Sequence, residues 1–117
     1  LDNRINNNPN FVMNEPLGYL DFLALMKYAK AVITDSGGLQ EETTALGIPC
    51  ITIRENTERP ITVEQGTNAI VGNSKENIIR EWKNIVKTGG KKGRIPEMWD
   101  GKTSQRIADE IIQYLNN

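Results

Sequence analysis

Histidine is absent from this chain of 117 residues, and Cys50 is its single cysteine. Histidine is the usual group for proton transfer near neutral pH, so its absence excludes a Ser-His-Asp triad and a histidine-based zinc site. A single cysteine also excludes an internal disulfide framework and a metal site made of several thiolates. Because Cys50 stands in the mainly apolar run from Pro49 to Ile53, we expect it to be a small buried side chain rather than a reactive thiol.

Long apolar runs and a strong charge imbalance are also missing. No stretch approaches the roughly 20 apolar residues of a membrane span, and the first residues lack the apolar core of a signal peptide. The formal net charge is -1, and the one dense basic cluster, residues 91–94, is expected to be a solvated loop. We therefore expect no membrane and no nucleic-acid partner. The chain begins at Leu1 without an initiator Met, which indicates a piece of a longer protein, and we expect that protein to be cytoplasmic.

Apolar runs that alternate with amphipathic segments predict an α/β fold. Strands are expected at residues 11–13, 31–34, 50–53 and 68–71, and helices at 21–29, 38–46, 62–65, 75–88 and 103–115. The helix at 21–29 is apolar almost all round and is expected to be largely buried. The first ten residues are polar and are expected to form a loop. Together these elements predict one domain over residues 1–117, with a parallel sheet of about four strands flanked by helices.

The most informative stretch is Thr34-Asp35-Ser36-Gly37-Gly38-Leu39-Gln40-Glu41-Glu42, which directly follows the apolar run Ala31-Val32-Ile33. A helix start presents free N–H groups and the positive end of its dipole. Glycines let an anion approach these donors closely, and Ser36 is either the helix cap or an extra hydroxyl donor. The turn therefore predicts a phosphate site, with close packing of helix on strand as the alternative. It contains neither the G-x-G-x-x-G fingerprint nor the Gly-Lys-Ser/Thr of a P-loop.

Other candidate residues surround this turn. Ligands of parallel sheets bind beyond the carboxyl ends of the strands, where the loop 54–60 is also expected. The arginines of that loop either form surface ion pairs or direct a guanidinium at phosphate oxygens. Glu41 and Glu42, expected in about the first turn of the helix, either complement the helix dipole or accept hydrogen bonds from a ribose diol. Tyr19 and Phe22 are either core residues or surfaces on which a base stacks.

Five motifs carry a resemblance to a known family. They are Pro16-Leu17-Gly18-Tyr19-Leu20-Asp21-Phe22, the 34–42 stretch, Arg54-Glu55-Asn56-Thr57-Glu58-Arg59-Pro60, Glu64-Gln65-Gly66-Thr67-Asn68 and Asp100-Gly101-Lys102-Thr103-Ser104-Gln105-Arg106-Ile107. In order and spacing they closely resemble the C-terminal half of the non-hydrolysing UDP-N-acetylglucosamine 2-epimerases, over about residues 11–115. The resemblance implies a glycosyltransferase-B architecture of two Rossmann-like domains, with most of the second domain present and none of the first.

The resemblance also implies which residues bind UDP. These are Phe22, Ser36, Gly37, Gly38, Glu42 and Arg59. The Ser-Gly-Gly turn would hold the diphosphate, and the glutamate would bind the ribose hydroxyls. The phenylalanine would lie near the uracil, and the arginine would face the charged end of the nucleotide.

The family reaction interconverts UDP-N-acetylglucosamine and UDP-N-acetylmannosamine for surface polysaccharide synthesis. It resembles an elimination of UDP to a glycal-like intermediate followed by re-addition, which needs a base at C2 and stabilisation of the departing diphosphate. The family's acid/base carboxylates and histidine lie upstream of the part present here, so we expect no catalytic residue, metal or cofactor in this chain. Without the N-terminal domain we expect the chain to bind UDP or a UDP-N-acetylhexosamine weakly or not at all, and not to epimerise.

Two other functions stay open at this point. The same strand, turn and helix would serve a glycosyltransferase of this architecture, although such a domain would lack the loop from Glu55 to Pro60. A non-enzymatic α/β module that binds a nucleotide or a partner chain is the second alternative. An edge strand near residues 4–10 would lack its usual neighbours, which favours pairing with another chain, including a homodimer.

Overall fold

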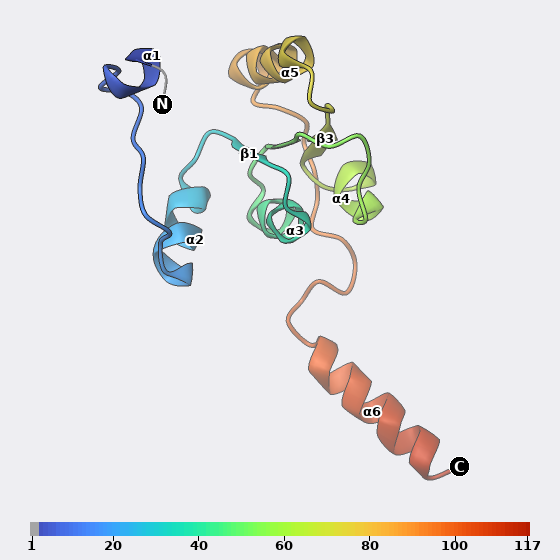
Figure 1. The fold of residues 1–117 in the computed structure, drawn as a ribbon. Helices are drawn as coiled ribbons and strands as arrows, with labels where there is room; N and C mark the ends of the chain where they lie inside the picture. The colour runs from blue at the N-terminus through green and yellow to red at the C-terminus, as the bar shows by residue number, and fades with distance from the viewer. Residues whose placement is uncertain (1–2) are drawn as a thin grey trace.

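A computed structural model describes residues 3–117 of the chain (Figure 1). Its elements in chain order are α1 (Asn3–Asn6), α2 (Tyr19–Lys27), β1 (Val32–Thr34), α3 (Gly37–Leu46), β2 (Cys50–Thr52), α4 (Pro60–Glu64), β3 (Asn68–Ile70), α5 (Lys75–Thr88) and α6 (Thr103–Leu115). The strands form one three-stranded parallel sheet in the order β1-β2-β3. The predicted class, a parallel sheet flanked by helices, is confirmed.

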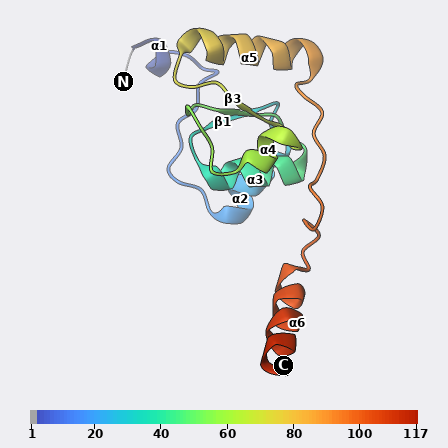
Figure 2. The same cartoon turned by 90° about the vertical axis from the view of Figure 1, so that its right-hand side faces the viewer.

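Helices cover both faces of the sheet. Figure 2 shows α5 on one face and α3 and α4 on the other, and α2 packs beside α3. The central strand β2 is buried along its whole length, with Cys50 1% and Ile51 0% exposed, as expected for a strand covered on both sides. Cys50 is thus a core side chain, as predicted, and its burial raises the pKa of the thiol.

The core between these layers is unusually polar. Its buried apolar side chains are Met26, Cys50, Ile51 and Ile85, whereas its buried polar side chains are Thr34, Gln40, Thr43, Thr44, Thr52, Thr62, Thr67 and Asn68. Buried polar groups are costly unless they are hydrogen-bonded. The fold therefore depends on specific hydrogen bonds between α3, α4 and the sheet as well as on apolar packing.

Capping residues mark where α3 and α5 begin and end. Ser36 occupies the N-cap position of α3, and Gly47 ends that helix with a φ of 73°, a left-handed conformation that glycine adopts without strain. At the start of α5 the Ser74 hydroxyl accepts a hydrogen bond from the Asn77 N–H, as predicted, and the helix ends at Gly89.

Three predictions for the N-terminal part and the sheet are wrong. Residues 11–13 form no strand and are exposed to solvent, and Asn3–Asn6 form the short helix α1 instead of a loop. The sheet has three strands rather than about four. A strand needs a neighbouring backbone to satisfy its N–H and C=O groups. Within residues 3–117 no strand pairs with residues 11–13, so their apolar pattern alone does not make them a strand.

The predicted burial of α2 is also wrong. Of its nine residues only Met26 is buried, whereas Leu20 and Leu25 are 76% and 58% exposed. The helix packs against α3 on one side, and the rest of its apolar surface is uncovered. Apolar composition alone does not bury a helix, because burial also requires a partner for each apolar face.

The last helix has the predicted bounds but stands apart from the other elements, as Figures 1 and 2 both show. Its large apolar side chains Ile107, Ile111, Ile112 and Leu115 are all more than half exposed. The radius of gyration is 17.7 Å, compared with about 13 Å for a compact domain of this size. None of the helices within residues 3–117 is long and apolar enough to cross a membrane.

Candidate functional site

The glycine turn and the arginine loop leave the sheet at the same edge. Thr34 ends β1 and lies opposite Thr52, which ends β2. Since the two strands are parallel, residues 35–36 and residues 53–59 follow them on the same side. This is the convergence that the sequence predicts for a ligand site.

At the turn, two of the three predicted amide donors are free. The Ser36 N–H donates to Thr34 Oγ1 at 3.0 Å and is therefore used within the chain. Gly37 and Gly38 are the first residues of α3, so their N–H groups have no acceptor inside the helix. No residue of the described part of the chain accepts from them elsewhere. Ser36 is exposed and its hydroxyl makes no capping bond, so the hydroxyl is available as a donor.

The fold itself does not require glycine at these two positions. A Cβ at Gly37 would meet no atom within 4 Å, and a Cβ at Gly38 would meet only Ser36 Oγ at 3.9 Å. Neither glycine has a positive φ. Gly66 is different, because a Cβ there would lie 2.3 Å from Thr44 Oγ1. The absence of side chains at the turn thus keeps open the space outside the chain, above the start of α3.

The charged candidates lie beside this space. Arg59 Nε contacts Glu41 Oε1 in an ion pair between the arginine loop and α3. The contact is ionic and lacks hydrogen-bond geometry, because this buried Nε atom has no hydrogen-bond partner. Glu42 follows in the same helix and is partly buried. Both glutamates stand in the second turn of α3, one turn later than predicted.

The aromatic candidates differ from each other. Phe22 is partly buried and lines an apolar cavity of about 260 Å³ together with Leu25, Ile33 and Leu39. Leu39 directly follows the glycine turn, so this cavity reaches the side of the molecule where α3 begins. Tyr19 is 63% exposed and takes no part in this cavity.

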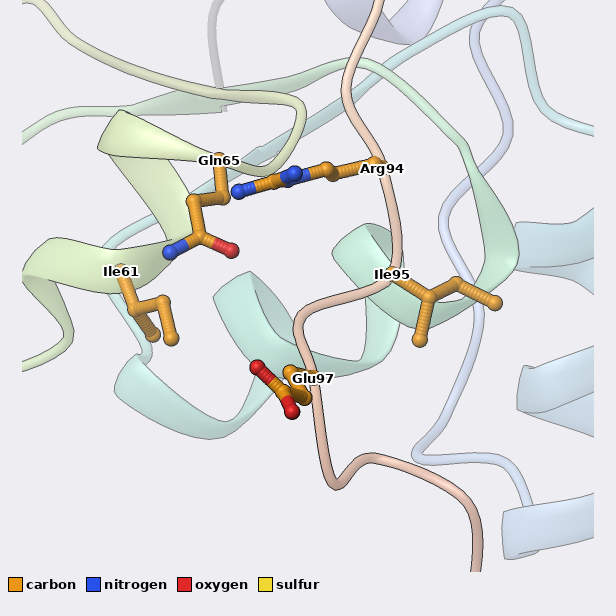
Figure 3. A pocket seen from close by; sticks show the side chains of 5 residues that line it. All are labelled: Ile61, Gln65, Arg94, Ile95 and Glu97. Atoms are coloured by element: carbon orange, nitrogen blue, oxygen red, sulfur yellow. The ribbon is translucent and has the colours of Figure 1, made fainter.

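A second cavity lies apart from the turn, at the C-terminal end of α4. It has a volume of about 280 Å³ and is lined by Ile61, Gln65, Arg94, Ile95 and Glu97. In Figure 3 the Arg94 side chain extends toward Gln65, and Glu97 lies on the other side of the cavity from these two. The Arg94 N–H donates to the Gln65 carbonyl at 2.7 Å.

The basic cluster that contains Arg94 is not wholly solvated, contrary to the prediction. Lys91 Nζ donates to the Val63 carbonyl and, at 2.5 Å, to the Asn68 carbonyl. Burial of this ammonium lowers its pKa. Lys91 therefore fastens the segment after α5 to α4 and β3. Among residues 3–117 no group of His, Cys, Asp and Glu side chains is arranged to hold a metal ion.

Sequence reasoning missed the buried side chains beneath the turn. Gln40 and Asn68 are 1% and 0% exposed and are hydrogen-bonded to each other. One signal was available, because a polar residue at the start of a predicted strand, as at Asn68, needs a partner wherever the strand is buried. The identity of that partner, 28 positions away in the sequence, leaves no local pattern.

Comparison with known proteins identifies close relatives. A family model described as UDP-N-acetylglucosamine 2-epimerase matches residues 1–112. The UDP-N-acetylglucosamine 2-epimerase of Methanocaldococcus jannaschii is 46% identical over 105 residues, which is 81% of this chain and 29% of the relative. The enzyme of the same name from Campylobacter jejuni is 38% identical over 112 residues, covering 92% of this chain and 29% of the relative.

Solved structures agree with the sequence comparison. The crystal structure of the M. jannaschii epimerase in complex with UDP-GlcNAc and UDP matches with a TM-score of 0.80 and 41% identity, over 96% of this chain and 30% of that one. The Staphylococcus aureus MnaA–UDP structure matches with a TM-score of 0.81 and 32% identity, over 93% and 30%. The fold thus corresponds to part of a glycosyltransferase-B-like epimerase, and the chain spans about 30% of the length of its relatives. By its sequence and its fold, this chain belongs to the UDP-N-acetylglucosamine 2-epimerase family.

Proposed function

We propose that this chain is the UDP-binding part of a UDP-sugar 2-epimerase that interconverts UDP-N-acetylglucosamine and UDP-N-acetylmannosamine. The observation that carries the proposal is the start of α3, where the N–H groups of Gly37 and Gly38 have no acceptor within the described chain and the fold does not require glycine. Amides of this kind bind phosphate oxygens, and the helix dipole adds to the attraction. Residues 1–117 would form one nucleotide-binding domain, the C-terminal half of the enzyme's architecture.

Each candidate residue then has one role. Gly37, Gly38 and the Ser36 hydroxyl bind the diphosphate. Glu42 accepts hydrogen bonds from the ribose hydroxyls, because a carboxylate can accept from both groups of a diol. Two further residues complete the site: Arg59 faces the charged end of the nucleotide, and Phe22 lies near the uracil.

This part of the enzyme would stabilise the leaving group rather than move protons. Departure of UDP from the sugar leaves negative charge on the diphosphate, and N–H donors and a guanidinium stabilise that charge. Removal of the proton at C2 needs a base, which we assign to the N-terminal domain that would close the other side of the site. The chain alone would therefore not epimerise. Of the two outcomes expected for its UDP binding, weak or none, the free N–H groups of Gly37 and Gly38 favour weak binding. The complete enzyme would work in the cytoplasm.

A titration of the ¹⁵N-labelled chain with UDP, followed by NMR, tests the proposal. We expect the largest amide shifts at Gly37 and Gly38, and weaker effects from uridine because it lacks the phosphates. If the signals of these two amides do not shift at millimolar UDP, the proposed UDP site is wrong. A coupled assay for UDP-N-acetylmannosamine should detect no product from the chain alone, and product formation would show that the catalytic groups lie within it.

A further inference from the structure

Beneath the proposed UDP site, a buried pair of side-chain amides joins α3 to β3. Asn68 Nδ2 donates to Gln40 Oε1 at 2.9 Å, and both residues are almost completely buried. On the sheet side, the Thr52 hydroxyl donates to Asn68 Oδ1 at 2.5 Å. The pair thus rests on the central strand and faces the loops that leave the sheet.

The pair reaches the glycine turn directly. Gln40 Nε2 donates to the Ser36 carbonyl at 3.2 Å. Ser36 is the N-cap residue of α3 and immediately precedes the two free amides. The position of its carbonyl sets the orientation of the following peptide N–H, which is that of Gly37, because the peptide unit is planar.

The same pair reaches both peptide groups of Arg59 through two threonines. The Thr57 hydroxyl donates to Gln40 Oε1 at 2.5 Å and accepts from the Arg59 N–H at 2.9 Å. The Thr62 hydroxyl accepts from Asn68 Nδ2 at 3.0 Å and donates to the Arg59 carbonyl at 2.7 Å. The backbone of Arg59 is therefore held on both sides.

The direction of these hydrogen bonds is fixed by the backbone. The Ser36 carbonyl can only accept, so the Gln40 atom that faces it must be the nitrogen, and the Gln40 atom that faces Thr57 must be the oxygen. The Thr57 hydroxyl therefore donates to Gln40 and accepts from the Arg59 N–H. The Arg59 carbonyl can only accept, so the Thr62 hydroxyl gives it its proton and receives one from the Asn68 nitrogen. A 180° rotation of either side-chain amide would place two donors or two acceptors opposite each other. The network consequently has one arrangement.

From this arrangement we propose that Gln40 and Asn68 are positioning residues. They hold the Ser36–Gly38 turn and the Arg59 loop in fixed positions relative to each other. The inference rests on the proposed function, because it assigns the two held segments to one UDP site. The two segments share no backbone hydrogen bond with each other. Loss of the link on one side should therefore loosen the other side, although the two are far apart in sequence.

Thr57 is the best point at which to break the link. It is only partly buried and lies in a loop, so Thr57→Val keeps the shape and should fold while losing both hydrogen bonds. Thr57→Ser keeps the hydroxyl and is the conservative variant. Thr67→Val is the matched control, since Thr67 is buried but its hydroxyl donates to the Ile48 carbonyl, before the start of β2 and outside the network.

Two measurements on the 117-residue chain give the test. The first is the NMR order parameter of the Gly37 and Gly38 amides without nucleotide, which Thr57→Val should lower while Thr67→Val leaves it unchanged. The second is the dissociation constant for UDP, which Thr57→Val should raise about tenfold, because the two lost hydrogen bonds position the site and do not contact the nucleotide. Thr57→Ser should restore both values, which a simple loss of stability would not do.

The outcomes separate this inference from the function on which it rests. If the wild-type chain binds UDP and Thr57→Val leaves the affinity and the glycine order parameters unchanged, the positioning role is overturned and the UDP site stands. If Thr67→Val weakens UDP binding as much as Thr57→Val, the effect is one of general stability and the positioning role is again overturned. If the wild-type chain shows no response to millimolar UDP at Gly37 and Gly38, the proposed function fails and this inference fails with it.

Discussion

Arg59 Nε lies against Glu41 Oε1 and so joins the loop after β2 to the second turn of α3. The two side chains are 41% and 42% exposed, and ion pairs with that much solvent contribute less than about 1 kcal/mol to stability. The contact therefore matters more for where it places the guanidinium than for the stability of the fold.

Replacement of this arginine should separate binding from stability. We expect Arg59→Gln to lower the free energy of unfolding by less than about 1 kcal/mol. The same change should weaken UDP binding by about tenfold or more, because it removes charge-assisted hydrogen bonds to the phosphates. Urea denaturation and a UDP titration measure the two effects. Arg80→Gln is the control, because Arg80 is exposed on α5 and the substitution changes net charge equally. An equal loss of affinity in both variants would indicate a general charge effect instead of a contact by Arg59.

The glycine turn allows a second separation. A side chain at Gly37 meets nothing within 4 Å, so Gly37→Ala should leave the urea midpoint unchanged or slightly higher, given the better helix propensity of alanine. The added methyl group would stand where the diphosphate approaches the amide, and UDP binding should fall at least tenfold, a loss of about 1.4 kcal/mol.

The matched control for the turn is Gly47→Ala at the other end of α3. Gly47 has a φ of 73°, so alanine there should cost about 1 kcal/mol of stability. It should leave UDP affinity unaltered. Binding of UDP by Gly37→Ala with wild-type affinity would exclude this amide from the site.

The sequence predicted the order of the elements from Val32 onward because their signals are local. The bounds of α6 were predicted in full, and α5 was set by the Ser74 cap and the glycines that follow it. The errors in the elements lie before Val32. Asn3–Asn6 form a helix instead of a loop, and the predictions for α2 and for residues 11–13 failed because their outcome depends on a partner surface. An apolar pattern indicates that a face can be buried, but it does not state what covers that face.

For the candidate site, the sequence predicted which segments meet and missed what holds them together. The parallel order of β1 and β2 necessarily brings the glycine turn and the arginine loop to one edge. The pairing of Gln40 with Asn68 and the contact of Arg59 with Glu41 join residues far apart in the chain. Such contacts are set by tertiary packing, and neither periodicity nor motif spacing contains them.

Cys50 should be protected from alkylation in the folded chain. It should also make the free energy of unfolding depend on pH in the alkaline range. It is 1% exposed, so iodoacetamide should modify it only when the chain unfolds. Burial raises the pKa of the folded thiol, so the unfolded chain loses this proton first as the pH rises. Above the ordinary thiol pKa the unfolded state then binds fewer protons, and the free energy of unfolding falls.

Comparison with Cys50→Ala isolates this dependence from that of other groups, including Lys91, whose lowered pKa acts in the opposite direction. The stability advantage of the wild-type chain over Cys50→Ala should be constant near neutral pH and should shrink as the pH rises past the thiol pKa. Urea denaturation across this range measures it. A constant difference throughout, or rapid alkylation of the folded chain, would mean that the thiol is accessible.

Removal of residues 103–117 should leave the fold of the rest intact. The hydrogen bonds that connect α6 to the preceding segment come from Arg106 to Asp100 and the Met98 carbonyl, both in the loop just before the helix. The chain ending at residue 102 should therefore keep its free energy of unfolding within about 0.5 kcal/mol, as expected for changes away from the core.

An apolar surface such as that of α6 favours association, so the shortened chain should also self-associate less in sedimentation experiments. Ile111→Glu in the full chain should reproduce that decrease without shifting the urea midpoint, because Ile111 is 55% exposed. A lower midpoint in either variant would show that α6 packs on the sheet domain in solution.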